Sequence, residues 1–271
     1  MTNFSATSIK LGYFSRRDES SQESVMLVEE VPLAITINGI THAIMMVTPT
    51  ALDAFSIGFA LNEGIIETAS DVRDISITDS PTSHLDIQGL AINLTISQRR
   101  FAEFKQGRIA RLGASGCGLC GTESLEYALP LLNKLPASKI LPESILTTLR
   151  ATLFDHQKIG KESGAIHAAM LVSPQGDCIT TMEDIGRHNA LDKALGYALQ
   201  NNINLYNHSV IMSSRCSTEL IQKAVRSGLS CLINLASPST LAVKLAQQYG
   251  LTLIHLPKKD APRVFASSYN Q

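Results

Sequence analysis

Residues 210–256, VIMSSRCSTELIQKAVRSGLSCLINLASPSTLAVKLAQQYGLTLIHL, decide the fold class of this chain. Three short apolar runs resemble buried strands, and they alternate with two segments that have the length and periodicity of helices. The runs lie at 210–213, 231–235 and 251–256, and the helical segments at 218–227 and 239–249. Strands that alternate with helices of this length predict right-handed crossovers and helix-covered parallel strands. We therefore expect a three-layer α/β/α domain.

The residues that precede this stretch extend the same domain. Two apolar runs, 165–172 and 178–182, flank a Pro174-Gln175-Gly176 turn and predict a β-hairpin. A helix is expected from about His188, because leucines recur there every four residues. A further helix is expected at 144–157.

The first half of the chain predicts a small α+β unit. Alternating apolar residues from Val31 predict a strand, Asn38-Gly39 a hairpin turn, and the residues up to Val47 a second strand. Thr48-Pro49 opens a helix. Two more strands and a polar, basic helix complete the unit, at 75–78, 90–96 and 98–111.

The chain is expected to divide into four segments. Residues 1–24 are polar and aperiodic and predict a flexible leader, followed by the small domain at 25–112. Four glycines among the nine residues 113–121 disfavour regular structure and predict a mobile loop. The larger α/β domain then occupies 122–271, and its first helical segment begins at 122–126.

The composition excludes several classes of protein. With 44% hydrophobic residues and a net charge of −1 from 23 basic and 24 acidic side chains, neither a disordered chain nor a general nucleic-acid binder is expected. No apolar run approaches the roughly 20 residues of a membrane helix, and the first ten residues show no secretory signal. The odd number of cysteines, five, favours the reducing cytoplasm, where cysteines serve metal, redox or nucleophilic chemistry.

Polar residues follow the predicted strands at what should be a single edge of the sheet. Ligands of open α/β sheets bind at the carboxyl ends of strands, beside helix N-termini. The polar clusters are Arg187-His188, Ser214-Arg215, Ser239-Thr240 and Lys258-Lys259. Cations, hydroxyls and helix N–H groups suit a phosphate-bearing ligand. Taken singly, Ser217 and Ser239 also fit ordinary helix N-caps, and the lysines a solvated turn.

The pair Cys117-Gly118-Leu119-Cys120 is compatible with three kinds of chemistry. Zinc would need two further ligands, and no second CxxC exists. A thioredoxin-like pair would follow a strand and open a helix, a setting that the flanking glycines oppose. A thiolate that carries sulfur must meet a donor and then an acceptor, and glycines give it that reach. Cys178 and Cys231 lie in strand patterns and resemble buried small hydrophobes.

His167 lies within an apolar strand, where a core histidine is the first interpretation. A zinc deaminase would carry a glutamate two residues after its histidine and a proline before a later CxxC. Here Ala169 takes the place of the glutamate, and the CxxC comes first. Hydrolytic deamination is therefore disfavoured, and no metal site is expected.

Several motifs together resemble the FdhD family, the formate dehydrogenase accessory sulfurtransferases. They are GCGLCG at 116–121, HAA at 167–169, EDIGRHNALDK at 183–193, SSR at 213–215 with Glu219 and QKA at 222–224, LAV at 241–243 with LTL at 251–253, and EVPLA at 30–34 with NGI at 38–40. The resemblance covers nearly the whole chain from about residue 24. This ordered set is far more specific than a lone CxxC.

The resemblance implies a cytidine-deaminase-like fold for the second half, without deaminase chemistry. It implies that a cysteine desulfurase donates persulfide sulfur, which passes to the molybdenum bis(molybdopterin guanine dinucleotide) cofactor of formate dehydrogenase. The family's persulfide cysteine falls on Cys117, with Cys120 assisting. Its cofactor segment falls on Leu256, Pro257, Lys258, Lys259, Asp260 and Ala261. A guanine nucleotide such as GDP is then expected to mimic the cofactor, and the resemblance suggests a homodimer.

Three positions depart from the family pattern. Ala114-Ser115 stand where an arginine often precedes the first cysteine, Asp260-Ala261 replace a Gly-Arg pair, and Cys216 replaces an alanine. The alternative function is a non-catalytic chaperone that binds the cofactor and hands it to its enzyme. Whether Cys120 resolves the persulfide through a disulfide or only supports the loop stays open.

Overall fold

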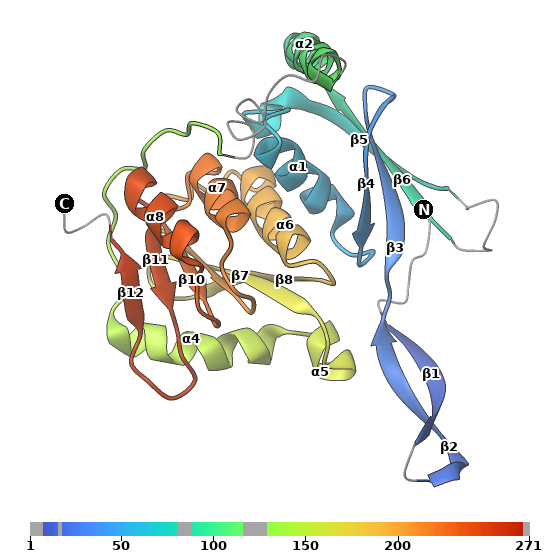
Figure 1. Ribbon diagram of the computed structural model, residues 1–271, viewed down its shortest axis with the longest axis vertical. Coiled ribbons are helices and arrows are strands. Elements are labelled where there is room, and N and C mark those ends of the chain that lie inside the picture. The colour runs from blue at the N-terminus through green and yellow to red at the C-terminus, as the bar shows by residue number, and fades with distance from the viewer. Residues whose placement is uncertain (1–7, 16–17, 81–87, 116–128, 268–271) are drawn as a thin grey trace.

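The computed structural model describes residues 8–15, 18–80, 88–115 and 129–267, which form two packed parts and a projecting β-hairpin (Figure 1). The first part is a four-stranded sheet with two helices on one face. The second part is a six-stranded sheet with helices on both faces. This mixed α/β architecture agrees with the α+β class expected from the sequence.

The first sheet has the strand order β4-β3-β6-β5. Its elements are β3 (Val31–Ile37), β4 (Ile40–Val47), α1 (Leu52–Asn62), the short 3-10 helix η1 (Ala69–Asp71), β5 (Val72–Asp79), β6 (Leu90–Ile96) and α2 (Gln98–Ser115). Asn38 and Gly39 make the predicted turn with φ of 46° and 79°. Every second side chain of β3 and β6 is buried against α1 and α2, as the alternating apolar pattern predicted.

The second sheet has the strand order β12-β11-β10-β9-β7-β8. Its strands are β7 (His167–Val172), β8 (Cys178–Asp184), β9 (Ser209–Met212), β10 (Cys231–Asn234), β11 (Thr252–His255) and β12 (Arg263–Ala266). Only β9, β10 and β11 run parallel, and β12 was not expected from the sequence. Its four residues are too short a run to give a clear period.

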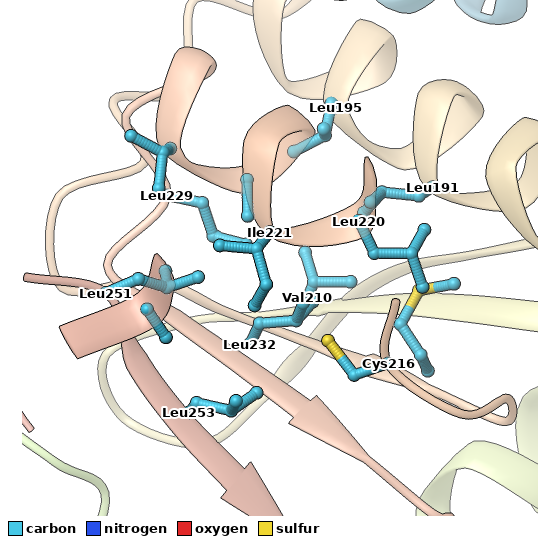
Figure 2. Packing of buried hydrophobic residues seen from close by; sticks show 14 of the residues in the cluster. Leu191, Leu195, Val210, Cys216, Leu220, Ile221, Leu229, Leu232, Leu251 and Leu253 are labelled. Carbon is cyan, nitrogen blue, oxygen red and sulfur yellow. The ribbon is translucent and has the colours of Figure 1, made fainter. Parts of the chain in front are cut away.

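Helices cover both faces of this second sheet (Figure 1). The helices are α4 (Glu143–His156), α5 (Ile159–Ser163), α6 (Arg187–Gln200), α7 (Thr218–Arg226) and α8 (Thr240–Tyr249). One apolar cluster joins the sheet to α6, α7 and α8, and a second joins the opposite face to α4. Figure 2 shows the first cluster, with Leu220 and Ile221 of α7 above Val210 and Leu232 of the sheet. The likeness to cytidine deaminases stays a prediction.

The two parts are joined by a close crossing of α1 and α6. A Cβ on Gly58 would lie 1.9 Å from the carbonyl oxygen of Asp192, and one on Gly196 would lie 1.8 Å from that of Ala54. Both distances are far below van der Waals contact, so only glycine allows these two backbones to touch. The crossing fixes α6, which carries most of the EDIGRHNALDK motif, against the first part.

Two predictions about the flanking segments differ from the structure. Residues expected to form a loose leader make an antiparallel hairpin of β1 (Ser8–Ser15) and β2 (Asp18–Val28). Residues 18–24 of β2 are polar and show no alternation of apolar and polar side chains, so they did not predict a strand. The alternation is clear only in the partner strand β1, at Ile9 and Leu11. The helix α2 also continues through Gly113 to Ser115, into the segment expected to be a loop. The rest of that loop and the helical start at 122–126 lie outside the described residues.

None of the described helices combines the length and the apolar composition that crossing a bilayer requires.

Candidate functional site

The predicted polar clusters meet at one edge of the second sheet. In the strand register, Met212, Asn234 and His255 are neighbours at the carboxyl ends of the three parallel strands. Ala169 of the antiparallel β7 is paired with Met212, which brings the start of β7 and the end of β8 to the same edge. Residues that follow these strand ends therefore gather there, as the sequence predicted. They are Arg187, Ser214, Arg215 and the segment Leu256 to Ala261.

This edge carries a surplus of positive charge. Arg187, Arg215, Lys258 and Lys259 take part in none of the ion pairs between described residues. The one carboxylate of the segment, on Asp260, binds Arg263 at 2.7 Å. The N-termini of α7 and α8 add partial positive charge at the same edge. Ser239 caps α8 by accepting the N–H of Ala242 at 3.2 Å, whereas the Ser217 hydroxyl donates to Glu219 instead.

The backbone of the edge is held from the opposite face by an arginine that no sequence pattern singled out. The guanidinium of Arg150, on α4, donates hydrogen bonds to the carbonyl oxygens of Leu235 and Leu256. These two carbonyls directly follow β10 and β11. Arg150 therefore fixes the point at which the Leu256 to Ala261 segment leaves the sheet. Its partners lie 85 and 106 residues away in sequence, so no local pattern could have shown them.

Two buried polar atoms at this edge lack partners within the described chain. They are Oδ1 of Asn234, a fully buried residue, and Nδ1 of His255, which is 6% exposed. Because side chains alternate between the two faces along a strand, Asn234 and His255 lie on the face that α7 and α8 cover. An unsatisfied buried polar group costs free energy, so its presence at a strand end indicates a place where a ligand or water binds.

Four of the ionisable residues of EDIGRHNALDK are buried, and each of them binds other groups of the chain. Glu183 accepts the backbone N–H groups of residues 158, 159 and 160 at 2.8–2.9 Å and thereby caps α5. Asp184 and Lys193 form a fully buried pair at 2.6 Å. Asp192 binds Lys223 at 2.7 Å. Charges in a sequence usually indicate a solvated face, which is why periodicity alone did not place these residues in the interior.

His188 lies apart from the other predicted ligands. It lines a cavity of about 550 Å³ between α1, α6, α7 and β4, together with Asn62, Asp192 and Lys223. Its Nε2 is 3.4 Å from a carboxylate oxygen of Glu219, without hydrogen-bond geometry. Burial and the nearby Arg187 and Lys223 lower the pKa of His188, so it is neutral at physiological pH. The structure places it between the two parts of the molecule as well as at the start of α6.

Comparison with known proteins assigns nearly the whole chain to one family. The model of the FdhD/NarQ family matches residues 28–270, which is nearly the entire chain.

The chain belongs to the FdhD/NarQ family.

Relatives in this family cover the chain almost end to end. Proteins named sulfur carrier protein FdhD from Burkholderia mallei and Burkholderia pseudomallei are each 38% identical over 254 residues, 91% of this chain and 90% of theirs. A protein of the same name from Burkholderia cenocepacia is 36% identical over 83% of this chain and 82% of its own. A crystal structure described as a formate dehydrogenase accessory protein, from Desulfotalea psychrophila, matches with a TM-score of 0.72. It covers 97% of this chain and 98% of its own at 23% identity, and so supports the fold alone.

The described cysteines of this FdhD/NarQ chain do not suit nucleophilic chemistry, with one partial exception. Cys216 and Cys231 are 2% and 3% exposed, and burial raises the pKa of each thiol to about 12. Figure 2 shows Cys216 enclosed among apolar side chains of the sheet and α7. Cys178 is partly exposed. Cys117 and Cys120 lie outside the described residues, so their predicted roles rest on the sequence and the family.

The burial of His188 in the cavity between α1, α6, α7 and β4 can be tested through the pH dependence of the protein's stability. Folding lowers the pKa of His188 from its ordinary value of about 6.5. At pH values between the pKa in the folded chain and about 6.5, the unfolded chain therefore binds a proton that the folded chain does not. Stability is then complete above about pH 6.5 and falls as the pH drops through that window. His188→Gln should lose less unfolding free energy than wild type between about pH 7 and pH 5, measured by urea titration. His156→Gln, at the exposed end of α4, is the control and should match wild type. An equal acid loss in wild type and His188→Gln would contradict the assignment.

Proposed function

We propose that this chain is a sulfur carrier that takes persulfide sulfur from a cysteine desulfurase on Cys117 and delivers it to the bis(molybdopterin guanine dinucleotide) cofactor of formate dehydrogenase. The observation that carries the proposal is the 38% identity, over 91% of the chain, to proteins named sulfur carrier protein FdhD. The formate dehydrogenase connection is drawn from the described role of the Desulfotalea protein and from the sequence motifs.

The chemistry asked of Cys117 is a simple exchange of sulfur. Its thiolate attacks the terminal sulfur of the desulfurase persulfide, the desulfurase cysteine leaves as a thiolate, and the terminal sulfur stays on Cys117. No external oxidant or reductant is needed. A free thiol titrates near 8.5, so cationic surroundings would favour the attacking thiolate. The burial of Cys216 and Cys231 supports the choice of a different cysteine for this step.

The sheet edge suits the cofactor as an anionic client. A pyrophosphate needs converging donors, and Arg187, Arg215, Lys258 and Lys259 supply cations that no described carboxylate neutralises. The unpartnered Oδ1 of Asn234 could accept a hydrogen bond from a base, and Nδ1 of His255 offers a second polar atom beside it. The Ser214 hydroxyl donates to the carbonyl oxygen of Arg215, so toward a ligand it would act as a hydrogen-bond acceptor.

Lys258 allows a direct test of this placement. Lys258→Glu should weaken the binding of GDP roughly tenfold at low salt, since it replaces an attraction to the pyrophosphate by a repulsion. The effect should shrink at high salt, because Lys258 is exposed and its field is screened. The matched control is Lys105→Glu, which reverses another exposed lysine, on α2, and should leave GDP affinity unchanged. Isothermal titration that gave the opposite ranking would show that the nucleotide binds elsewhere.

The sulfur-carrier and chaperone functions differ in whether the chain becomes covalently loaded with sulfur on Cys117. Intact-protein mass spectrometry, after incubation with a cysteine desulfurase and cysteine, should show a gain of one sulfur atom that a reductant removes. A chain that retains the cofactor or GDP but gains no sulfur would support the non-catalytic chaperone.

A further inference from the structure

The cavity between α1, α6, α7 and β4 is lined by none of the residues that we assign to the cofactor. We call it the junction cavity, because α1 and β4 belong to the first part of the molecule and α6 and α7 to the second. Its volume of about 550 Å³ falls within the roughly 300–1,000 Å³ of sites that bind small molecules. Such sites often lie where two folded parts meet. The size and position of the junction cavity therefore suit a small ligand.

Part of the lining of the junction cavity is apolar and aromatic. Met45 of β4 and Phe59 of α1 contribute to it. The ring of His42 also lines the cavity and packs edge-on against Phe59, with 5.8 Å between the ring centroids. This combination of an apolar surface with a few polar groups is typical of a site that holds the hydrocarbon part of a small molecule.

A buried acceptor in the lining lacks a hydrogen-bond donor. Asn62 is 9% exposed, its Nδ2 donates to Asp192, and its Oδ1 has no partner within the described chain. Lys223 donates to both oxygens of Asp192, so this carboxylate accepts hydrogen bonds and holds the amide nitrogen of Asn62 toward itself. A buried carbonyl oxygen without a donor costs free energy. The lining is therefore complemented by a ligand that donates hydrogen bonds.

Charged groups of both signs line the junction cavity, and two of them are unpaired. Asp192 and Lys223 form an ion pair at 2.7 Å. Glu63 and Arg226 take part in none of the ion pairs between described residues, although Arg226 donates one hydrogen bond to a backbone oxygen of α1. Burial raises the pKa of Asp192, and the nearby carboxylate of Glu63 raises it further, whereas Lys223 lowers it. Added positive charge beside these two carboxylates would therefore be favourable, while Arg226 needs an anion.

We propose that the junction cavity binds a free α-amino acid in its zwitterionic form, with an apolar or thioether side chain. The ammonium group supplies the donor that Oδ1 of Asn62 lacks and neutralises the carboxylate of Glu63. The carboxylate of the ligand pairs with the guanidinium of Arg226, whose planar fork matches a carboxylate. The side chain of the ligand lies against Met45 and Phe59. This ligand pairs both unpaired charges and satisfies the buried acceptor.

Three other classes of ligand fit the junction cavity less well. A phosphate or another anion would meet the carboxylates of Glu63, Asp192 and Glu219, which all line the cavity. The described residues contain no group of three or more His, Cys, Asp or Glu side chains that could hold a metal ion. An amine without a carboxylate would leave the guanidinium of Arg226 unpaired. A zwitterion has neither defect.

Matched probes test the two charges of the ligand on the full chain. L-Methionine and L-leucine should bind in isothermal titration and raise the unfolding midpoint, since they bind the folded chain alone. Methylthiobutyrate, which lacks the ammonium group, and methylthiopropylamine, which lacks the carboxylate, should each bind at least about tenfold more weakly than L-methionine. Absence of binding by both amino acids would show that the cavity holds only water and would overturn the proposal. Equal binding of L-methionine and either analogue would overturn the zwitterionic ligand.

Two variants test whether the amino acid binds in the junction cavity. Arg226→Gln and Asn62→Leu should each weaken the binding of L-methionine at least about tenfold. Arg73→Gln, at an exposed position of β5, is the matched control and should bind as wild type does. Circular dichroism and the unfolding midpoint establish that each variant is folded, and Asn62→Ser replaces Asn62→Leu if that variant is not.

The affinity for GDP separates this site from the sheet edge. Arg226→Gln should bind GDP as tightly as wild type, because Arg226 lines the junction cavity and not the edge. Wild-type affinity for L-methionine in both Arg226→Gln and the folded Asn62 variant would overturn the placement in this cavity. The proposal does not depend on the sulfur-carrier function, and a chain that carries no sulfur could still bind the amino acid.

Discussion

Lys193→Met should destabilise the folded chain by about 3–5 kcal/mol, because it leaves the buried carboxylate of Asp184 without its cation. Lys193 is fully buried, and its Nζ faces four oxygens: Asp184 at 2.6 Å, and Thr48, Thr50 and Glu183 at 3.0 Å each. Burial lowers the pKa of Lys193, but four acceptors around one nitrogen suit a protonated ammonium. Since Thr48 and Thr50 belong to the first part and Glu183 to the second, the loss should loosen both together.

Urea unfolding followed by circular dichroism measures this loss. Lys244→Met, an exposed lysine on α8, is the matched control and should change stability by no more than about 0.5 kcal/mol. Combining Lys193→Met with Asp184→Asn should cost less than the sum of the two single changes, because the double variant no longer buries an unpaired charge. A loss below about 1 kcal/mol in Lys193→Met would show that the pair contributes little.

Cys117→Ala should abolish sulfur transfer and with it the activation of formate dehydrogenase. The expected loss is at least about a thousandfold, since the nucleophile that holds the sulfur is removed. Cys120→Ala should retain a measurable fraction if Cys120 only assists release. Both variants should keep the wild-type unfolding midpoint and GDP affinity, which separates loss of chemistry from loss of structure. Equal loss from Cys117→Ala and Cys120→Ala would instead favour a dithiol mechanism.

Much of the fold follows from local patterns in the sequence. The alternation of Leu33, Ile35 and Ile37 predicted β3. The sequence Asn38-Gly39 predicted a hairpin turn, and both residues adopt the positive φ that such a turn requires. Such signals depend on near neighbours, so one sequence suffices to find them. The strand β2 was not predicted because its polar half shows no alternation, and its pairing with β1 supplies what the pattern lacks.

The site was predicted less completely, because its contacts are distant in sequence. The carboxyl ends of parallel strands lie at the same edge of a sheet, so the residues that follow those strands were expected to lie together. This reasoning placed Arg187, Arg215 and Lys258 at one edge. The clamp from Arg150 and the burial of Asp184 with Lys193 depend on packing between distant segments, which no local pattern encodes. The EDIGRHNALDK motif was therefore a correct sign of the family but an incomplete guide to ligand contacts, since much of it joins α6 to the first part.

The most direct test of the sulfur-carrier proposal is to locate the transferred sulfur on the chain. Wild-type protein is incubated with a cysteine desulfurase and cysteine, alkylated without reduction, digested, and fragmented in a mass spectrometer. We expect one additional sulfur on Cys117 of wild type and Cys120→Ala, and none on any cysteine of Cys117→Ala. Additional sulfur on the partly exposed Cys178, or persistent sulfur loading of Cys117→Ala, would contradict the proposal.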